Sequence, residues 1–483
     1  MENCQIFTPP TIVNKMLDMI GYTDDNIATN TILEPSFGDG AFLVPIVQRI
    51  LQYGKQNNKT ADEIIAMLGN VYGVELDKKY FDITKQRLSA LIQAEGLDYD
   101  WPNLYNGDTL TYNPPIKFDF CIGNPPYIRV HDCSKETRQV IKDNYVMGKG
   151  NTDLYIIFYE KGIQCLKETG ALCYIAPNSY FKNSSQKEFR KYLTKNNLVE
   201  EIVDYGTVKV FGAVDTYTAI TLLKKKRKSA QTKYSMMESL ETVEYSCLIN
   251  LATTNGERWI FNSPATMKWI DKVKQRSQKL GDLCEIQFGI ATNADSIYVI
   301  SQEFAATLEN EIVRPVVKAS KLTEGKYIIF PYEWNQDKQK YVPIEEGIFQ
   351  RKYPKAYRYL ERNKTQLMAR DMEKNIPWYA YARSQGLQNS QNKKIAIKHI
   401  LSPESENCEI KECNEQTLVF SGIYIIVKDL NNYNQVLEIL RGKELYKYLF
   451  TIGKNMSGGY KNVNAKAIKS YGIPESKEKL SQK

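Results

Sequence analysis

Short apolar runs alternate with amphipathic stretches throughout the first half of the chain. The runs that predict strands are residues 31–33, 71–74, 118–122, 171–176, 201–204 and 216–223. Apolar residues recur at helical spacing over residues 41–53, 78–94 and 153–166, and the last of these helices is expected to end at Glu168-Thr169-Gly170. Strands that alternate with helices form a doubly wound, mostly parallel sheet, so we predict a Rossmann-like α/β fold.

The pattern is weaker in the second half. Residues 327–330, 394–397 and 423–427 predict strands and residues 353–372 predict a helix, which together indicate a mixed α/β domain. A basic run, Lys224-Lys225-Lys226-Arg227-Lys228-Ser229, separates the halves, and we interpret it as a linker or a phosphate contact rather than a nuclear-import signal. The predicted domains are residues 1–228 and 229–483.

Composition describes an ordinary globular protein, with 42% hydrophobic and 25% charged residues in a chain of 483. Neither a membrane span nor a secretory signal is expected, because the chain has no run of 18 apolar residues and no basic start before an apolar core. The nine cysteines are dispersed, which indicates reduced thiols in a cytosol. The pairs His131/Cys133 and Cys408/Cys413 could suggest zinc, but with two histidines in the chain we predict no metal site.

The net charge of +8 is divided unevenly along the chain. Residues 1–223 contain 22 Lys and Arg and 27 Asp and Glu, a balance of −5, whereas residues 224–483 contain 42 and 29, a balance of +13. A slightly acidic first half beside a basic second half fits a small-molecule domain joined to a domain that binds a polyanion. The alternative is that the lysines are simply solvated on a large surface.

A stiff tetrapeptide, Asn124-Pro125-Pro126-Tyr127, follows the predicted strand 118–122. The two prolines fix φ and lack N–H groups, so the chain leaves the sheet rigidly at the edge where α/β sheets bind ligands. The amide oxygen of Asn124 and the Pro125 carbonyl can accept both hydrogens of an amino group on a flat ring, and Tyr127 can stack on that ring. The alternative is a proline-rich surface turn.

A glycine turn, Glu34-Pro35-Ser36-Phe37-Gly38-Asp39-Gly40, follows the first predicted strand. Gly38 and Gly40 would let the backbone approach a ligand closely. The turn lacks the full Gly-x-Gly-x-x-Gly of dinucleotide sites, and the chain has no Gly-Lys-Ser/Thr of a phosphate-binding loop. Its acidic residues instead suit a ligand that has a positive centre or hydroxyl groups.

Two further carboxylates follow in order along the chain. Glu75, in Glu75-Leu76-Asp77, ends the second predicted strand and can accept ribose hydroxyls, and Asp108, in Asn106-Gly107-Asp108, suits an adenine amino group. Each is a common turn by itself. In this order, with strands between them, the acidic turns favour S-adenosylmethionine, which has a sulfonium cation, a ribose and an adenine.

These residues together resemble the gamma class of amino-group DNA methyltransferases, which modify the exocyclic N6 of adenine and often belong to bacterial restriction-modification systems. The order of N-terminal segment, cofactor turn, tetrapeptide and large C-terminal target domain is specific to that class. Residues 378–385 and 457–460 show a weaker likeness to its target domains, from which we assign no base contact. The resemblance is carried by residues 7–13, 34–40, 124–127, 150–155, 175–179 and 210–212, with Glu75 and Asp108.

The resemblance implies a Rossmann-like methyltransferase domain followed by a DNA target-recognition domain, acting on a flipped-out adenine in duplex DNA. It implies a cytoplasmic protein of a bacterium, archaeon or phage, and a restriction endonuclease, if there is one, on a separate chain. Phe211 would contact the target base, with an ordinary core or loop aromatic as the alternative. The implied catalytic residues are Asn124, Pro125, Pro126 and Tyr127, and the implied cofactor-binding residues are Thr8, Glu34, Gly38, Gly40, Glu75, Leu76 and Asp108.

Other functions remain open at this point. The Asn124–Tyr127 set would also suit an RNA base or a glutamine side-chain amide, although a glutamine target needs no large basic domain. Methylation of a cytosine amino group is a further alternative, but relatives of that kind more often have serine in place of Asn124. A catalytically silent DNA-binding specificity subunit belongs to a different class, and the intact cofactor turn argues against it.

Overall fold

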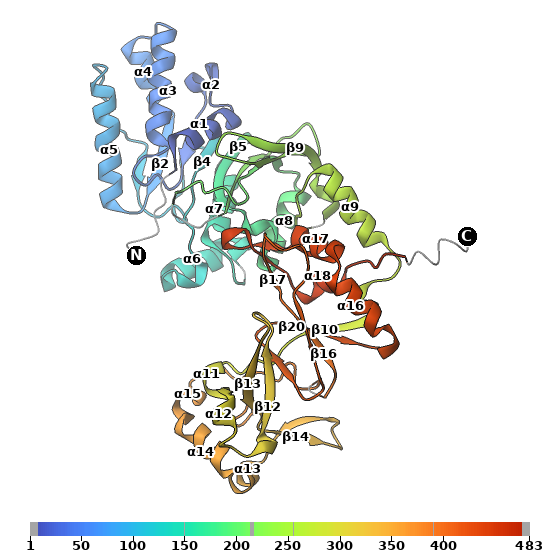
Figure 1. The fold of residues 1–483 in the computed structure, drawn as a ribbon. Coiled ribbons are helices and arrows are strands. Elements are labelled where there is room, and N and C mark those ends of the chain that lie inside the picture. Colours follow the sequence, from blue (N-terminus) through green and yellow to red (C-terminus); the bar gives the residue numbers. More distant parts are fainter. Residues whose placement is uncertain (1–7, 149, 213–216, 255, 390, 476–483) are drawn as a thin grey trace. The chain divides into compact units, whose positions relative to one another are not determined.

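The computed structural model describes residues 8–148, 150–212, 217–254, 256–389 and 391–475. Contacts within the chain divide it into two compact units, Met1–Pro264 and Ala265–Lys483 (Figure 1). The first unit contains an extended sheet with helices packed on it, and the second contains several smaller sheets and short helices.

A nine-stranded sheet is the centre of the first unit, in the order β3-β2-β1-β4-β5-β7-β6-β8-β9. Neighbouring strands from β3 to β5 are all parallel, whereas β7 is antiparallel to both β5 and β6. The strands are β1 (Ile32–Glu34), β2 (Val71–Glu75), β3 (Leu104–Asn106), β4 (Phe118–Gly123), β5 (Leu166–Pro177), β6 (Val199–Asp204), β7 (Thr218–Lys224), β8 (Gln231–Met237) and β9 (Val243–Asn250).

Helices cover both faces of this sheet, because its central strands are apolar on both sides. Ile32 and Ile122 belong to a core with α1, α3 and α5, while the adjacent residues Leu33 and Cys121 belong to a second core with α7 and α8. The predicted doubly wound, mostly parallel α/β fold is confirmed. The helices are α1 (Pro10–Ile20), α2 (Asp25–Thr29), α3 (Leu43–Gln56), α4 (Ala61–Leu68), α5 (Lys78–Gln93), α6 (Lys135–Asn144), α7 (Leu154–Cys165) and α8 (Lys187–Lys195).

The predicted helix stop at Glu168-Thr169-Gly170 is wrong. Helix α7 ends at Cys165, and β5 begins at the next residue, where Leu166 pairs with Phe118 of β4. Residues 167–170 form an irregularity in the pairing before the regular register resumes at Ala171. Pairing between strands that are distant in sequence therefore decides the end of this helix, against the local signal of a glycine.

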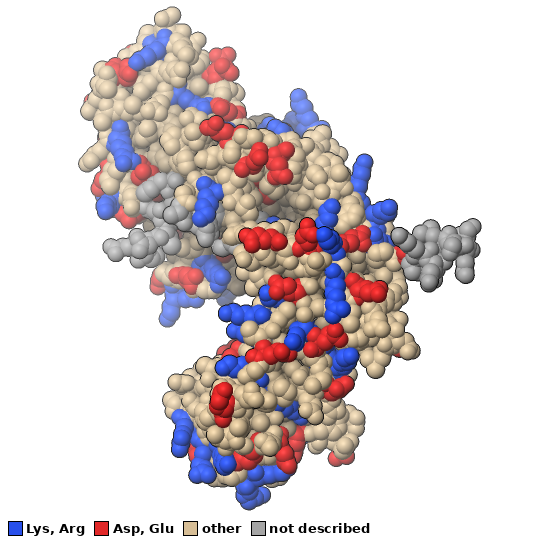
Figure 2. Space-filling model, in the orientation of Figure 1, with Lys and Arg blue, Asp and Glu red and all other residues tan. Residues whose placement is uncertain are grey.

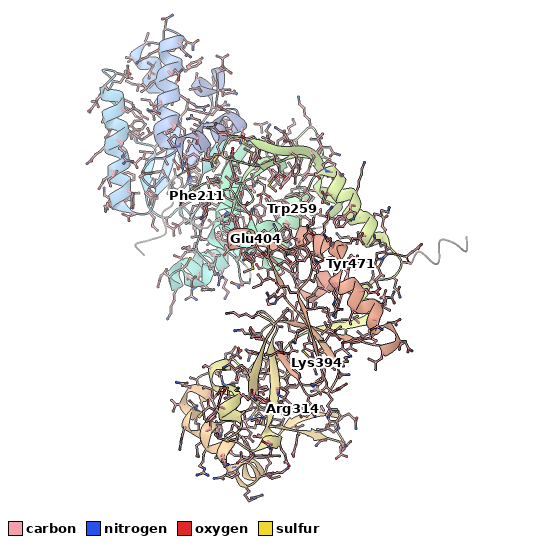
Figure 3. The ribbon with its side chains drawn as sticks, viewed as in Figure 1. Phe211, Trp259, Arg314, Lys394, Glu404 and Tyr471 are labelled. Carbon is pink, nitrogen blue, oxygen red and sulfur yellow. The ribbon has the colours of Figure 1, made fainter. Side chains whose placement is uncertain are left out.

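The first unit continues past residue 228, up to Pro264. Its sheet continues through β8, which is parallel to β6, and through β9, which forms the antiparallel edge. Trp259 then returns to the same unit: its backbone N–H donates to the Phe181 carbonyl at 2.8 Å, and its indole ring is 1% exposed (Figure 3). Residues 229–264 thus belong to the first unit.

The second unit is mixed α/β, as predicted. Its two four-stranded sheets have the orders β10-β20-β16-β18 and β11-β13-β12-β19. Arg314 lies over the Phe330 ring at 4.1 Å, and the buried Lys394 donates to the Thr417 carbonyl at 3.2 Å (Figure 3). The strands are β10 (Cys284–Phe288), β11 (Val299–Ser301), β12 (Val313–Lys318), β13 (Thr323–Ile329), β14 (Tyr332–Asn335), β15 (Lys340–Pro343), β16 (Lys394–Ile397), β17 (Ile400–Leu401), β18 (Ile410–Cys413), β19 (Leu418–Phe420), β20 (Ile423–Val427), β21 (Lys454–Asn455) and β22 (Lys461–Asn462).

The helix predicted at residues 353–372 is divided in two at Asn363, whose φ of −99° and ψ of 8° lie outside the helical region. The helices of this part of the chain are α9 (Pro264–Gln275), α10 (Leu280–Leu283), α11 (Asp295–Tyr298), α12 (Gln302–Ala305), α13 (Glu346–Lys352), α14 (Pro354–Arg362), α15 (Lys364–Met368), α16 (Tyr433–Arg441), α17 (Lys443–Ile452) and α18 (Ala465–Lys469).

A buried arginine holds the last segment of the first unit in place. Arg190 on α8 is 1% exposed and donates to the carbonyls of Tyr180, Asn183, Gly256 and Glu257 at 2.7–3.0 Å. Burial lowers the pKa of its guanidinium to about 10, so it stays charged at neutral pH. One rigid cation with several donors therefore satisfies four backbone carbonyls.

We expect Arg190→Met to lower the free energy of unfolding of the first unit by about 3 kcal/mol, because buried carbonyls lose their donors. Urea denaturation followed by tryptophan fluorescence measures this. Arg138→Met, on the exposed face of α6, is the control, with an expected change within about 0.5 kcal/mol. Equal effects of the two substitutions would contradict the assignment.

Candidate active site

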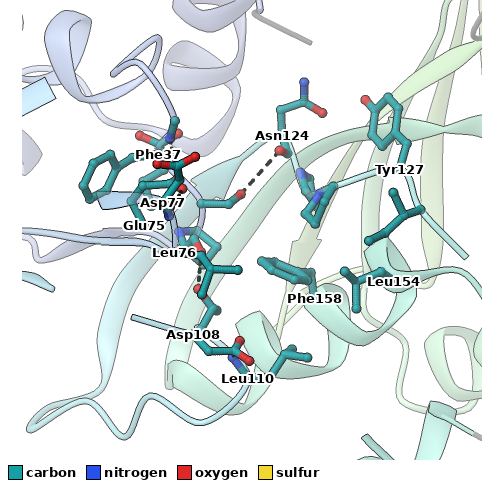
Figure 4. A pocket seen from close by; sticks show the side chains of 18 of the residues that line it. Phe37, Glu75, Leu76, Asp77, Asp108, Leu110, Asn124, Tyr127, Leu154 and Phe158 are labelled. Carbon is teal, nitrogen blue, oxygen red and sulfur yellow. Dashed lines mark hydrogen bonds between the residues drawn. The ribbon is translucent and has the colours of Figure 1, made fainter. Parts of the chain in front are cut away.

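A cavity of about 520 Å³ lies at the carboxyl ends of the parallel strands in the first unit (Figure 4). Glu34 ends β1, Glu75 ends β2, and Asn124 directly follows β4, and all three line the cavity. Asp108 reaches it from the turn after β3. This is the edge at which open α/β sheets bind ligands.

The glycine turn between β1 and α3 is fixed by its backbone and by Glu75. Gly38 and Gly40 have φ of +52° and +87°, which favour glycine. The Gly38 N–H donates to Glu75 Oε2 at 2.8 Å, and a Cβ at Gly40 would lie 2.9 Å from a methyl of Thr84. The turn therefore needs glycine at both positions, and Gly38 lines the cavity while Gly40 lies beside it.

The same side of the cavity is strongly acidic. Five carboxylates and no lysine or arginine are found among the described residues that line it: Glu34, Asp39, Glu75, Asp77 and Asp108. Glu34 is 1% exposed, and its Oε2 has no hydrogen-bond partner among the described residues. Burial, together with the nearby charges of Glu75 and Asp39, raises the pKa of Glu34 well above its usual value. A positive ligand would find a favourable potential here.

Hydrogen bonds to the backbone hold the other carboxylates in place. Glu75 accepts from the amides of Gly38 and Asp77, both at 2.8 Å, and Asp108 accepts from the Leu110 amide at 2.8 Å. Burial raises the pKa of Glu75, and these amide bonds oppose the shift. Beside them Leu76 is 68% exposed, an apolar side chain that a flat ring could cover.

The tetrapeptide lies on the opposite side of the cavity from these carboxylates (Figure 4). The side-chain amide of Asn124 donates to Thr8 Oγ1 at 3.3 Å, and its backbone carbonyl accepts from Ser36 Oγ at 3.4 Å. The Tyr127 hydroxyl donates to the Ile175 carbonyl at 3.3 Å, and burial raises the pKa of this phenol. Hydrogen bonds within the protein thus orient the side chains of Asn124 and Tyr127.

Two aromatic rings pack edge-on against Tyr127. The ring of Tyr155 lies 6.5 Å from it at 79°, and the ring of Phe211 lies 6.3 Å from it at 60°. Tyr155 belongs to α7 and Phe211 to the segment between β6 and β7. An aromatic corner therefore borders the turn that contains Asn124.

The structure brings nearly all the predicted site residues together. Gly40 and Phe211 lie beside the cavity rather than in its lining, and Phe7, from the predicted N-terminal segment, lies outside the described residues. The roles of these residues stay predictions. The cavity is lined by Thr8, Glu34, Gly38, Glu75, Leu76, Asp108, Asn124, Pro125, Pro126 and Tyr127.

Other lining residues were not singled out from the sequence. Phe37 and Asp77 are neighbours of predicted residues, and Asp77 also caps α5 by accepting from the Lys79 amide at 2.8 Å. Leu154 and Phe158 lie on α7, a helix that is buried nearly all round, so the sequence pattern could not separate a cavity wall from core.

In the part of the chain that the structure describes, no group of three or more His, Cys, Asp or Glu is arranged to hold a metal ion. Cys133 lines the cavity, and the nearby His131 pairs with Asp132. The helices within the described ranges include none that combines the length and apolar character of a membrane span.

We expect Glu34→Gln to stabilise the protein at pH 8 in the absence of ligand. The pKa of Glu34 is raised in the folded state. Its contribution to stability is therefore complete below pH 4.5, the pKa of the unfolded chain, and is lost as the pH rises through the pKa of the folded protein. The gain should be about 1.4 kcal/mol for each unit of that shift. Urea unfolding between pH 5 and pH 8 measures it. The exposed Glu168→Gln is the control, and a pH profile unchanged by Glu34→Gln would refute this reading.

The chain is similar to known restriction-modification methylases. Residues 69–211 match the model of the Eco57I restriction-modification methylase family. The chain is 27% identical over 361 residues to the type II methyltransferase M.BstVI of Geobacillus stearothermophilus, an alignment that covers 67% of this chain and 64% of that protein. It is 25% identical to the type II methyltransferase M.PaeR7I of Pseudomonas aeruginosa, with coverage of 97% and 85%.

A solved structure supports the fold. The type IIL restriction-modification enzyme MmeI, determined in complex with DNA, matches with a TM-score of 0.62 at 13% identity over 98% of this chain and 66% of its own. The chain thus spans slightly less than two thirds of M.BstVI and of MmeI. The match of residues 69–211 to the Eco57I restriction-modification methylase family confirms the resemblance predicted from the sequence.

Proposed function

We propose that this protein is a site-specific DNA methyltransferase that transfers a methyl group from S-adenosylmethionine to the N6 of adenine. The observation that carries the proposal is the single cavity in which an acidic, glycine-rich turn faces the Asn124–Tyr127 tetrapeptide. The methylase family match and the type II methyltransferases among the relatives support DNA methylation. The choice of adenine rests on the residues of the tetrapeptide.

The acidic side fits S-adenosylmethionine. Burial and the repulsion of nearby carboxylates raise the pKa of Glu34, and a sulfonium cation near it would offset that repulsion. Each oxygen of Glu75 accepts one amide and has capacity for a further hydrogen bond from a ribose hydroxyl. Asp108 would accept from the adenine amino group, and the exposed Leu76 would pack on its ring. When bound, this cofactor would supply an activated methyl group.

The tetrapeptide fits the amino group of the target base. An adenine amine is a weak nucleophile because its lone pair is delocalised into the ring. Asn124 Oδ1 and the Pro125 carbonyl would accept its two hydrogens and stabilise the positive charge that develops on the nitrogen. With Asn124 Nδ2 donating to Thr8 Oγ1, Oδ1 is the end of the amide that would accept from the target amine. No protein base is needed, since the product ammonium is acidic and loses its proton to water.

The base must leave the duplex to reach this turn. Unpairing costs a few kcal/mol, and stacking on an aromatic ring returns about 1–3 kcal/mol per base. Tyr127 provides the ring within the cavity, and Phe211 packs against its edge. The aromatic corner therefore makes base flipping energetically accessible.

The second unit would read the DNA. Residues 265–483 contain 35 Lys and Arg and 25 Asp and Glu, a balance of +10, which suits phosphate contacts. On the face shown in Figure 2, Lys and Arg are interspersed with Asp and Glu. We therefore assign DNA binding to the unit and no base contact to any one residue. By analogy with its restriction-modification relatives, the protein would act in the cytoplasm of a bacterium or archaeon or during phage infection, and a cognate restriction endonuclease, if there is one, would be a separate chain.

A direct assay tests the function against its alternatives. Purified protein with labelled S-adenosylmethionine is offered duplex DNA, RNA and protein side by side, and we expect transfer to duplex DNA. Transfer to RNA or to protein glutamine alone would overturn the proposal, and a protein that binds duplex DNA but no cofactor would be a silent specificity subunit. Sequencing the modified DNA then distinguishes adenine from cytosine.

We expect Asn124→Ala to lower the rate of methyl transfer by about 100-fold or more, because the charge that develops on the amine loses an acceptor. Affinity for the cofactor, measured by calorimetry, should change less than about 3-fold, since the carboxylates are untouched. Asn57→Ala, at the exposed end of α3, is the matched control and should retain full activity. Equal losses of transfer and of cofactor affinity would give Asn124 a different role.

We expect Tyr127→Ala to reduce methylation of fully paired DNA by about 10- to 100-fold, because the flipped base loses its stacking ring. The loss should be much smaller on DNA with an unpaired adenine at the target position. Tyr127→Phe, which keeps the ring and loses the hydroxyl bond to Ile175, is the control. Equal loss on both substrates would show that stacking does not promote flipping.

A further inference from the structure

We propose that Asp204 is a positioning residue, which holds the segment that carries Phe211 against the ring of Tyr127. The inference rests on the proposed function, since Phe211 and Tyr127 would border the flipped base. It starts from a buried carboxylate that the catalytic scheme does not use. Asp204 ends β6 and is 5% exposed.

Asp204 is bound by three donors. Its Oδ1 accepts from the side-chain amide of Asn178 and from the backbone N–H of Gly206, both at 2.9 Å. Its Oδ2 accepts from the Tyr234 hydroxyl at 2.9 Å. A buried carboxylate is costly unless it is hydrogen-bonded, so these three contacts specify one arrangement of the surrounding backbone.

The donors come from three different parts of the sheet. Asn178 directly follows β5, Tyr234 lies on β8, and Gly206 lies just beyond Asp204 itself. The Gly206 backbone has φ of +52°, and a Cβ there would lie 3.1 Å from the sulfur of Met236. Asp204 thus fixes the start of the segment after β6 relative to the strands on both sides of it.

That segment leads directly to Phe211. The Tyr205 amide donates to Thr218 at 3.0 Å, the Val208 amide donates to Tyr205 at 2.7 Å, and Val210 is 2% exposed. The next residue is Phe211, whose ring packs on Tyr127 at 6.3 Å. A short, partly buried and hydrogen-bonded path therefore connects Asp204 to the aromatic corner.

The second ring of the corner is supported from the same place. Ser179, the residue after Asn178, lies 3.3 Å from the Tyr155 hydroxyl through its Oγ, and Tyr155 is the other ring against Tyr127. Asn178 thus contacts Asp204, which precedes the segment of Phe211, and Ser179 contacts Tyr155. The Asn178-Ser179 pair lies in a segment that resembles the methyltransferase family. Its role, on this geometry, is to hold the aromatic residues around Tyr127 in position.

A double-mutant cycle tests the inference in the full-length protein. Asp204→Ala is made in the wild type and in Phe211→Ala, and kcat and KM are measured on unmethylated plasmid DNA. We expect kcat/KM to fall about 10- to 100-fold in the wild-type background, because a displaced ring misplaces the base. In the Phe211→Ala background the further loss should be below about 3-fold, since the two positions act together. Cofactor affinity should not change.

Glu160→Ala is the matched control. Glu160 is also a buried carboxylate, and it accepts from the backbone amides of Val146 and Met147 at 2.9 Å, away from Phe211. The fold-loss of kcat/KM caused by Glu160→Ala should be the same in the wild-type and the Phe211→Ala backgrounds. Asp204→Asn, whose amide can keep the contacts to Asn178, Gly206 and Tyr234, should restore activity to within about 3-fold. Equal fold-losses for Asp204→Ala in both backgrounds would overturn the proposal.

A fluorinated phenylalanine at position 211 gives a readout that needs no reaction. Its fluorine NMR resonance should shift in Asp204→Ala and stay in place in Glu160→Ala. A shift in a protein that methylates no DNA would support the positioning role and refute the proposed function, whereas an unchanged resonance would overturn the positioning role. If Asp204→Ala does not fold, Tyr234→Phe removes one donor and should cost about 3-fold in the wild-type background alone.

Discussion

Parallel pairing of β1 with β2 and β4 is the constraint on which the site depends. Parallel strands place their carboxyl ends at one edge, so residues as distant in sequence as Glu34, Glu75 and Asn124 meet around one cavity. The pairing is maintained by burial on both faces, since adjacent residues such as Ile32 and Leu33 belong to different cores. Hydrophobic residues outside the cavity therefore position the polar residues that line it.

The acidic side of the cavity is organised at an electrostatic cost. Glu34 is buried among other carboxylates, and the residues described in the cavity lining include no lysine or arginine. Burial and the neighbouring negative charges together raise its pKa. Two backbone amides, one of them from the glycine turn, donate to Glu75 and stabilise its negative charge. The same bonds make the turn rigid, so the charge that would attract a cationic cofactor also shapes its binding surface.

Local patterns in the sequence predicted the elements that place this site. Strand ends and turns gave Glu34, Gly38, Glu75, Asp108 and Asn124, because each lies within a few residues of a clear strand signal. Phe158 escaped detection because a cavity wall on a fully apolar helix looks like core. The helix stop at Gly170 was wrong because pairing of Leu166 with β4 outweighed the local signal. The first unit continues past residue 228 because β8 pairs with β6, from which β7 separates it in sequence, and β9 then pairs with β8. Local sequence patterns do not show that β8 adds to the same sheet.

The contact between Thr8 and Asn124 connects the two sides of the cavity. Thr8 was predicted to bind the cofactor, and in the structure its hydroxyl accepts from the amide that would receive the target amine. A cofactor held by Thr8 would therefore act on the orientation of Asn124 through one hydrogen bond. Tyr127, two residues beyond Pro125, is oriented separately by Ile175 and by the rings of Tyr155 and Phe211. Recognition of the amine would thus be coupled to the cofactor, whereas stacking of the base would be coupled to the aromatic corner and to Asp204 behind it.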